Sequence, residues 1–407
     1  MPGVELLPIH LLREIMLGAS SIDEMFTVAQ VSKLWRDVAL DTPLLWSSFK
    51  GGASKADYYR IPLILERSGP TTILHIYLRF AGGAAVWPAN ALRALVPYVA
   101  RIGTLDVEFA ALVQSLLSLS TPRLRILDLT GFSPTNWDAL LVPGLEDIRL
   151  CNAVFARRPL APALHELDLW MDKEDLERVL KTGFSDVVLH TLTARVYNDN
   201  DVEVVTSNLL LPGVGPLIVF ETTDDQHFEL CDTAGRIRRL QCWNDDSYFE
   251  FADVWEHLSL HHNLHETVRT IRIATRFWDS YAQMFGQYPP QVREGITLAI
   301  KMDWVPYHEN GQLIFSDEGG RDETTQLQDM RLSGLTKVDF FGDYMVLQPI
   351  LNFLAHIEPP TDRKVAVCLG DRELKAEPGG TILPFSAFQT AIAALPGNPW
   401  AICSHCA

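Results

Sequence analysis

The sequence lacks the patterns that mark several large classes of protein. It has no uninterrupted apolar run of the roughly 18 residues that a membrane-spanning helix needs, because the nearest run, LLLPGVGPLIVF, is broken by two glycines and two prolines. Its start does not offer a charged segment, an apolar block and a cleavage site in the order of a secretory signal. We therefore expect a protein that neither crosses a membrane nor is secreted.

Basic residues are also scarce. The 407 residues include 34 basic and 51 acidic side chains, which gives a net charge of −17. Such a surface repels nucleic-acid backbones and anionic lipids, so we expect neither nucleic acid nor membrane as a partner, and basic protein segments are favoured instead. The six cysteines are scattered, which is typical of reduced thiols in the cytoplasm or nucleus.

Catalytic motifs are missing as well. The chain has no Walker loop, no G-x-S-x-G elbow and no Gly-rich phosphate turn after a strand. In EHLSLHHNLHET, His257, His261 and His265 are four residues apart, a spacing that suits zinc ligands on one helix face. Asn263, however, favours a helix stop before His265, and no HExxH motif is present. We predict no metal, no cofactor and no catalysis; a metal-dependent enzyme using these histidines is the alternative.

The first fifty residues carry more large apolar side chains than three short helices can bury. Pro8 suits the opening of a helix that Gly18 ends, and Thr42 with Pro43 predicts a short third helix. Between them we expect one longer helix, whose apolar stripe consists of Met25, Val28, Val31, Trp35 and Val38. Some of this surface must meet either the next domain or another protein, and spacing alone leaves both open.

In order and spacing, the motifs of this segment resemble an F-box. They are Leu7-Pro8, Leu11-Leu12, Ile15, Val31-Ser32, Trp35-Arg36 and Pro43-Leu44-Leu45-Trp46. His10 departs from the family pattern, in which an acidic residue is common at that place. The resemblance implies that residues 1–50 form a three-helix domain that docks on the Skp adaptor and, through it, on a cullin-based ubiquitin ligase.

The resemblance also implies which residues the adaptor covers. They are Leu7, Pro8, Leu11, Leu12, Ile15, Val31, Trp35, Leu45 and Trp46. Trp35 fits the core of the domain equally well. An adaptor would explain the surplus of apolar surface, because helix-face interfaces concentrate binding energy in a few apolar anchors.

Residues 51–400 repeat a pattern of short apolar alternations. The eleven segments are GTLDVEF, RILDLTG, EDIRLCN, HELDLWM, HTLTARV, PLIVFET, RRLQCWN, RTIRIAT, GITLAIK, TKVDFFG and RKVAVCL. Helical stretches are expected between many of them, among them residues 110–119, 173–180 and 249–260. Strands alternating with helices at this period predict an array of parallel strands.

The most regular of these units resemble leucine-rich repeats. Their Leu-x-x-Leu-x-Leu skeletons are Leu124, Leu127, Leu129; Leu145, Ile148, Leu150; and Leu164, Leu167, Leu169. Phe132, Ala153 and Asp172 replace the usual Asn or Cys, so the curvature stays open. The resemblance implies an α/β fold: a three-helix F-box, then an irregular leucine-rich-repeat-like solenoid with a parallel inner sheet, and a tail over residues 401–407. This combination resembles a large group of fungal F-box proteins.

Alternation along each strand predicts a surface for a second partner, because the residues between apolar positions face away from the core. The proposed substrate-binding residues on this surface are Asp106, Asp128, Asp168, Trp170, Trp243 and Phe341. We expect a substrate receptor of a ubiquitin ligase that binds a basic or mixed protein segment here. An F-box scaffold without a ubiquitination role stays open, and the longer loops after residue 305 are the alternative binding region.

Overall fold

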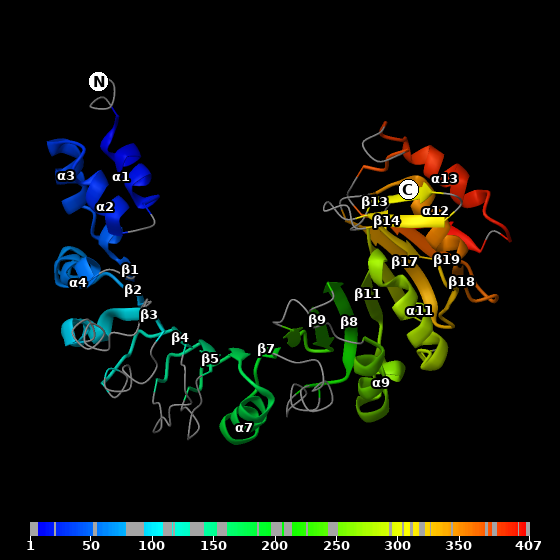
Figure 1. Cartoon of the computed structure of the whole chain (residues 1–407), viewed down its shortest axis with the longest axis horizontal. Helices are drawn as coiled ribbons and strands as arrows, with labels where there is room; N and C mark the ends of the chain where they lie inside the picture. The colour runs from blue at the N-terminus through cyan, green and yellow to red at the C-terminus, as the bar shows by residue number, and fades with distance from the viewer. Residues whose placement is uncertain are drawn as a thin grey trace. The chain divides into compact units, whose positions relative to one another are not determined.

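The computed structural model of the chain divides into two compact units, Met1–Ala194 (unit 1) and Arg195–Ala407 (unit 2) (Figure 1). Each unit is mixed α/β and contributes to a large, mostly parallel sheet. The structure describes residues 7–19, 22–51, 55–78, 93–108, 116, 119–130, 142–152, 161–184, 187–196, 206, 214–224, 227–242, 251–292, 295–302, 305–309, 312–316, 322–325, 327–342, 345–370, 373–376, 381–397 and 399–403.

Unit 1 begins with a group of short helices. They are α1 (Ile9–Leu17), α2 (Ile22–Val28), α3 (Lys33–Leu40) and the 3₁₀ helix η2 (Pro43–Trp46). Pro8 and Gly18 flank α1 as predicted. The single longer helix predicted from Met25 to Val38 is wrong, because the chain breaks between α2 and α3. Ser32 is extended there, and its side chain accepts a hydrogen bond from the Trp35 amide, which starts a new helix.

The predicted cap of η2 is also formed differently. Thr42 precedes η2, but its hydroxyl donates to the carbonyl of Val38 at 2.7 Å and does not cap the helix that follows. The hydroxyl therefore secures the end of α3, as Ser and Thr side chains do when they bond back along a helix.

Parallel strands form the sheet of unit 1 in the order in which they occur in the chain. They are β1 (Ser48–Gly51), β2 (Leu74–Leu78), β3 (Ile102–Val107), β4 (Ile126–Thr130), β5 (Asp147–Cys151) and β6 (Glu166–Trp170). The strand β7 (Thr191–Val196) follows β6 in the order of the sheet. The helices α4 (Lys55–Arg67), η3 (Val96–Arg101) and α7 (Lys173–Gly183) lie between strands. Buried and half-buried residues alternate along β4, so the leucines of the predicted skeleton form the core side of the sheet.

Unit 2 combines an antiparallel start with parallel strands. Its main strands are β8 (Leu217–Asp224), β9 (His227–Asp232), β10 (Ile237–Cys242), β11 (Thr270–Ala274), β12 (Ile296–Lys301), β17 (Leu335–Phe341), β19 (Val365–Leu369) and β20 (Trp400–Ile402). From β8 through β11 to β20 neighbouring strands are parallel, whereas β9 is antiparallel to both β8 and β10. All eleven predicted strands exist, but the expectation of a purely parallel array is wrong here.

The tight turn between β9 and β10 explains this reversal. The carboxylate of Asp232 accepts hydrogen bonds from the amides of Ala234 and Arg236 at 2.8 and 2.9 Å. Gly235 has φ +76°, a conformation that glycine adopts without strain. A chain that turns this tightly must run back beside the strand it has left, because parallel neighbours need a long crossover.

A layer of helices covers one face of the unit 2 sheet. Its members are α9 (Phe251–His262), α10 (Leu264–Thr267), η5 (Thr275–Phe277), α11 (Trp278–Gln287), α12 (Leu347–Ala355) and α13 (Phe385–Ala393). Figure 1 shows α9 and α11 beside β8 and β11. Phe220 on β8 packs edge-on against Trp255 of α9, with ring centroids 5.3 Å apart, so aromatic pairs join the helix layer to the sheet in the core of unit 2.

Two smaller sheets complete unit 2. The antiparallel strands β13 (Val305–Glu309), β14 (Gln312–Ser316) and β15 (Asp322–Thr325) lie where the sequence predicted loops, and β16 (Met330–Arg331) pairs with β18 (Ile357–Glu358). The helices predicted over residues 173–180 and 249–260 are confirmed as α7 and α9. The helix predicted over residues 110–119 falls mostly outside the described residues. Among the described helices, none combines the length and the apolar character needed to span a bilayer.

Candidate partner-binding surfaces

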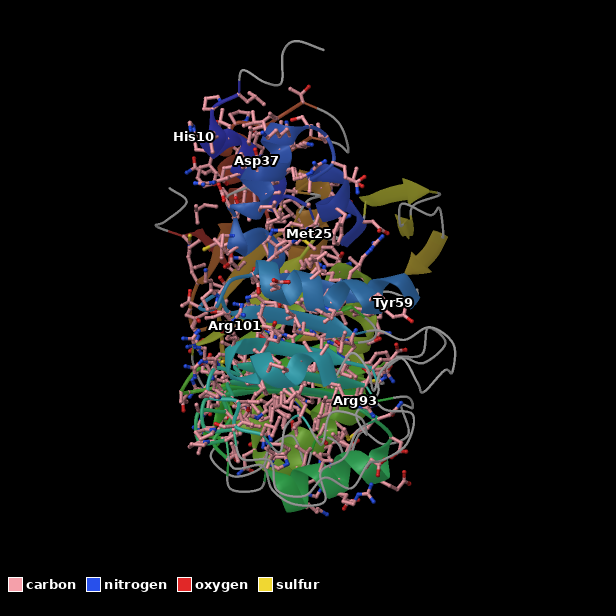
Figure 2. All side chains as sticks on the ribbon, turned by 90° about the vertical axis from the view of Figure 1, so that its left-hand side faces the viewer. His10, Met25, Asp37, Tyr59, Arg93 and Arg101 are labelled. Atoms are coloured by element: carbon pink, nitrogen blue, oxygen red, sulfur yellow. The ribbon has the colours of Figure 1, made fainter. Side chains whose placement is uncertain are left out.

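One side of α1 presents apolar side chains to solvent. Leu11 and Ile15, one helical turn apart, are 42% and 51% exposed. Pro8 is exposed on the same side, three residues before Leu11, while Leu7 is half-buried. Val31, just before α3, is 58% exposed. Figure 2 shows this end of unit 1, with His10 of α1 and Asp37 of α3 labelled. These predicted adaptor-binding residues are accessible to a partner.

The other predicted adaptor-binding residues lie inside unit 1. Leu12, Trp35, Leu45 and Trp46 are all buried. Leu12 belongs to the buried side of α1, which packs against the rest of unit 1. Its packing therefore fixes the helix that carries Leu11 and Ile15. The structure thus divides the predicted set into exposed residues and the buried residues that position them.

Trp46 shows how the buried residues are fixed. Its indole N–H donates to the carbonyl of Ala39 at 2.8 Å, and its ring meets the edge of Phe26 at 5.6 Å. The Arg67 guanidinium of α4 lies over the ring, 4.6 Å from the centroid. α4 therefore covers part of the apolar surface of the helices, which agrees with the first of the two alternatives, and another part stays exposed.

Sequence reasoning missed several exposed apolar residues of the same helices. They are Ile9, Leu17, Leu40 and Leu44. The buried residues Leu12 and Met16 form the middle of one side of α1. Leu11 and Ile15 flank them on one edge, and Ile9 and Leu17 flank them on the other. A signal was available, because the segment IHLLREIML is apolar around most of the helix, more than one buried stripe requires.

One face of the unit 1 sheet carries a continuous row of charged and aromatic residues. The register aligns Tyr77, Asp106, Asp128, Arg149 and Asp168 on successive strands from β2 to β6. All are half-buried or exposed, as alternation predicted. Side chains opposite one another on neighbouring strands interact directly. The structure therefore brings the predicted acids Asp106, Asp128 and Asp168 together in one row.

Arg149 is the cation at the centre of this acidic row. Its guanidinium binds the carboxylate of the partly buried Asp147 at 2.8 and 3.2 Å. The hydrogen bond to Asp147 raises the pKa of Arg149, and the nearby charges of Asp128 and Asp168 add to the rise. Arg149 is therefore fixed on this face by Asp147 and lies close to the carboxylates of the two neighbouring strands.

The row has an aromatic residue at each end. Trp170 on β6 is half-buried and lies in register with Cys151 of β5. At the other end, Tyr77 lies under the ammonium of Lys50, 5.6 Å from the ring centroid. Sequence reasoning missed Tyr77, although the alternation in LHIYL matches the predicted strands. Trp243, the second predicted anchor, lies outside the described residues.

In unit 2 the corresponding sheet face pairs its charges. Across β10, β9, β8, β11 and β17, three acids each bind a cation: Glu229 binds Arg239 at 2.6 Å, Glu221 binds Arg272 at 2.7 Å and Asp339 binds Lys337 at 2.8 Å. Phe341, the predicted aromatic contact of β17, is half-buried on the same side as Asp339.

The histidine cluster of unit 2 lies around the end of α9. The rings of His257 and His261 are 4.5 Å apart, but Asn263 adopts a left-handed conformation and places His265 on α10. Burial lowers the pKa of His262, and the charges of His257 and His261 lower it further. Within the described residues, no three His, Cys, Asp or Glu side chains are arranged to hold a metal ion.

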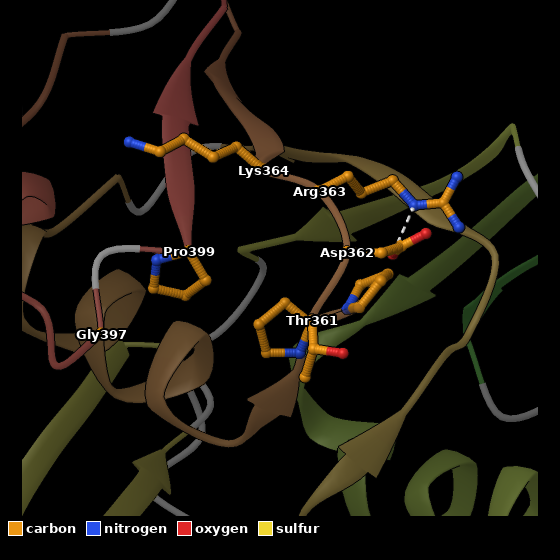
Figure 3. A pocket seen from close by; sticks show the side chains of 8 residues that line it. Thr361, Asp362, Arg363, Lys364, Gly397 and Pro399 are labelled. Atoms are coloured by element: carbon orange, nitrogen blue, oxygen red, sulfur yellow. Dashed lines mark ion pairs between the residues drawn. The ribbon is translucent and has the colours of Figure 1, made fainter.

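A cavity of about 600 Å³ opens between the loops that precede β19 and β20 (Figure 3). Pro359, Pro360 and Pro399 form part of its wall, and Asp362 lies 3.4 Å from the Nε atom of Arg363. Its charged groups thus already include an ion pair. We assign this open cavity no ligand.

Comparisons with known proteins add no family to these observations, because no family model and no curated protein matches the chain.

Proposed function

We propose that this protein is the substrate-recognition subunit of a Skp–cullin–F-box ubiquitin ligase. It docks on the Skp adaptor through the F-box-like helices α1–η2 and binds a protein substrate with the strand region that follows, which is an irregular leucine-rich-repeat-like solenoid. The protein itself is non-catalytic, works in the cytoplasm or nucleus, and uses no metal or cofactor.

The observation that carries the adaptor proposal is the exposed apolar surface of the first helices. Seven of the fifteen large apolar side chains that are exposed among the described residues lie between Ile9 and Leu44. Exposed apolar groups concentrated in one short segment favour a protein partner over solvent. Leu11, Ile15 and Val31 coincide with the positions at which the F-box resemblance implies adaptor contact, and buried residues hold them on short, fixed helices.

The acidic row of unit 1 supports the substrate proposal. Asp106, Asp128 and Asp168 attract a basic segment over a distance, which favours fast association. Trp170, at the end of the row, offers the large amphipathic surface that anchors many protein interfaces. A basic segment that runs across the strands meets both features.

Affinity purification of the full chain from its native cells, with and without proteasome inhibition, tests this function. We expect the adaptor and a cullin to co-purify under both conditions, and a substrate to accumulate only when the proteasome is inhibited. Co-purification of the adaptor without any cullin or accumulating protein would favour a scaffold. Absence of the adaptor would refute the F-box proposal.

A further inference from the structure

Two cysteines of unit 2 lie opposite one another on neighbouring strands. Val367 of β19 is in register with Ile402 of β20, and the amide of Cys403 donates to the carbonyl of Val367 at 3.0 Å. The ladder therefore continues by one residue, which places Cys403 beside Cys368. Both side chains are buried, and neither is in a disulfide.

The two thiols share one face of the sheet. Val365 and Val367 are buried on the helix-covered side, so Cys368 points to the other side, where it is in register with Asp339 of β17. Neighbouring strands are about 4.7–4.9 Å apart. That spacing falls inside the Cα separation of about 4.4–6.8 Å that disulfides require. The Cβ atoms of in-register residues on parallel strands are separated by about the same 4.7–4.9 Å, slightly more than the roughly 3.5–4.5 Å of a disulfide, so the bond needs a small inward shift of one strand.

A cation lies next to this pair. The Lys337 ammonium is 2.8 Å from the carboxylate of Asp339, and this hydrogen bond is the main cause that raises the pKa of Lys337. Burial works against the rise, while negative charge on Cys368 and Cys403 adds to it. A neighbouring cation stabilises a thiolate, which is the reactive form of cysteine.

The chain can also bring the two sulfurs together. β20 is the last strand in the order of the sheet and contains only Trp400–Ile402. An edge strand bonded to one neighbour moves more easily than a central one. The small side chains of Ala366 and Ala401, two residues before the cysteines on the same face, leave the approach unobstructed.

We propose that Cys368 and Cys403 are a modification site, a dithiol that hydrogen peroxide converts reversibly into a cross-strand disulfide. One thiolate attacks a peroxide oxygen, the O–O bond breaks, and hydroxide leaves with the thiol proton as water. The second thiolate then attacks the sulfenic sulfur, the S–S bond forms and a second water leaves. Two thiols are oxidised and one peroxide is reduced to two waters, so the reaction balances.

Cys231 provides a control within the same unit. It is more exposed than Cys368, and it stands alone on β9. Burial raises the pKa of the Cys231 thiol, and the charges of Asp232 and Glu229 raise it further. If exposure alone governed oxidation, Cys231 would react before the Cys368–Cys403 pair; if the paired geometry governs it, the order is reversed.

Peroxide titration of the full chain tests the proposal, with alkylation of the remaining thiols and peptide mapping by mass spectrometry. We expect a peptide linked through Cys368 and Cys403 to appear at lower peroxide than any oxidation of Cys231, and dithiothreitol to release it. Cys368→Ser and Cys403→Ser should each abolish the link. Lys337→Met should slow the reaction several-fold at neutral pH and move its pH profile upward, and Lys337→Arg should restore both.

Two results would overturn the proposal. One is oxidation of Cys231 without any linked Cys368–Cys403 peptide. The other is a bond between Cys403 and Cys406, which would place the reactive pair in the chain terminus. Circular dichroism of each variant, matched to the wild-type spectrum, ensures that a missing link reports on chemistry and not on unfolding.

Discussion

The two units of this protein differ in how many of their large apolar side chains are exposed. Thirteen of the fifteen exposed large apolar side chains in the described residues belong to unit 1, and only Leu260 and Ile382 belong to unit 2. Conversely, nine of the eleven largest fully buried side chains belong to unit 2, with Trp46 and Phe49 the exceptions. The largest aromatic side chains of unit 2 are thus buried in its core, whereas unit 1 leaves more large apolar side chains exposed.

The ionic contacts on the charged faces of their sheets also differ. In unit 2, the acids Glu221, Glu229 and Asp339 each face a cation at 2.6–2.8 Å. In unit 1, the Arg149 guanidinium binds Asp147 at 2.8 Å and lies near the charges of Asp128 and Asp168. Exposed apolar side chains are therefore concentrated in unit 1, and large buried aromatic side chains in unit 2.

The largest effect on stability is expected from Trp255→Ala in unit 2. This fully buried indole donates to the carbonyl of Tyr288 at 2.9 Å and packs against Phe220 and Phe285. Removing it should lower the free energy of unfolding by about 3–5 kcal/mol, measured by urea unfolding. Leu260→Ala on the same helix is the matched control, because Leu260 is 61% exposed and should change stability by less than about 0.5 kcal/mol. An equal loss of stability in both variants would contradict the assignment of Trp255 to the core of unit 2.

Asp232→Asn should come next. Burial disfavours the charge of Asp232, but hydrogen bonds from the amides of Gly215, Arg236 and Ala234 and from the Arg236 guanidinium outweigh burial and lower its pKa. Replacing it should cost about 1–3 kcal/mol, because buried donors lose their acceptor. A lowered native pKa means that the contribution is complete above the unfolded value of about 3.9 and is lost as the pH falls through the native pKa.

The pH dependence makes this prediction specific. The difference in unfolding free energy between wild type and Asp232→Asn should be constant near neutral pH and shrink below about pH 4. Urea unfolding at several pH values measures it. A difference that grows on acidification would contradict the role assigned to the carboxylate.

Trp170→Ala should weaken substrate binding through unit 1. If Trp170 anchors the substrate, its loss should raise the dissociation rate by an amount worth about 2 kcal/mol, measured by surface plasmon resonance with the accumulated substrate. Adaptor binding should not change, because Trp170 lies on β6 and not on the helices. An unchanged dissociation rate would remove Trp170 from the binding surface.

A smaller effect is expected from charge removal, and it compares the two faces directly. Replacing Asp106, Asp128 and Asp168 by Asn should slow association with the substrate and flatten its salt dependence. The matched change in unit 2, Glu221→Gln with Glu229→Gln, should leave association unchanged and lower stability by up to about 1 kcal/mol for each partly exposed pair. Equal effects on association would place the substrate across both faces.

Much of the fold was predictable from the sequence, because alternation identifies a half-buried strand directly. Leu127, Leu129 and the corresponding apolar pairs of the other ten segments lie in strands as expected. The direction of β9 and β10 was not predictable in this way, since alternation carries no direction and the Asp232 turn determines it. The break before Ser32 was missed because apolar periodicity continued across a residue that also caps helices.

The candidate surfaces were predictable only in part. Alternation places Asp106, Asp128 and Asp168 on one face, but the register that aligns them, and the fact that Arg149 is bound to Asp147, depend on contacts between distant segments. Likewise, spacing groups Leu11 with Leu12, and only packing determines that Leu11 is exposed and Leu12 is buried.

The binding of the purified Skp adaptor to the full chain, measured by isothermal titration calorimetry, tests the central claim most directly. The decisive variant is Leu11→Asp with Ile15→Asp, and the matched control is Tyr59→Asp with Leu63→Asp, which lie one turn apart on α4 outside the first helices. All four residues are exposed, so both variants should fold like the wild type. The account predicts that the first variant loses at least about 100-fold in affinity while the control stays within about tenfold of the wild type. Wild-type affinity in the folded Leu11→Asp, Ile15→Asp variant would contradict it.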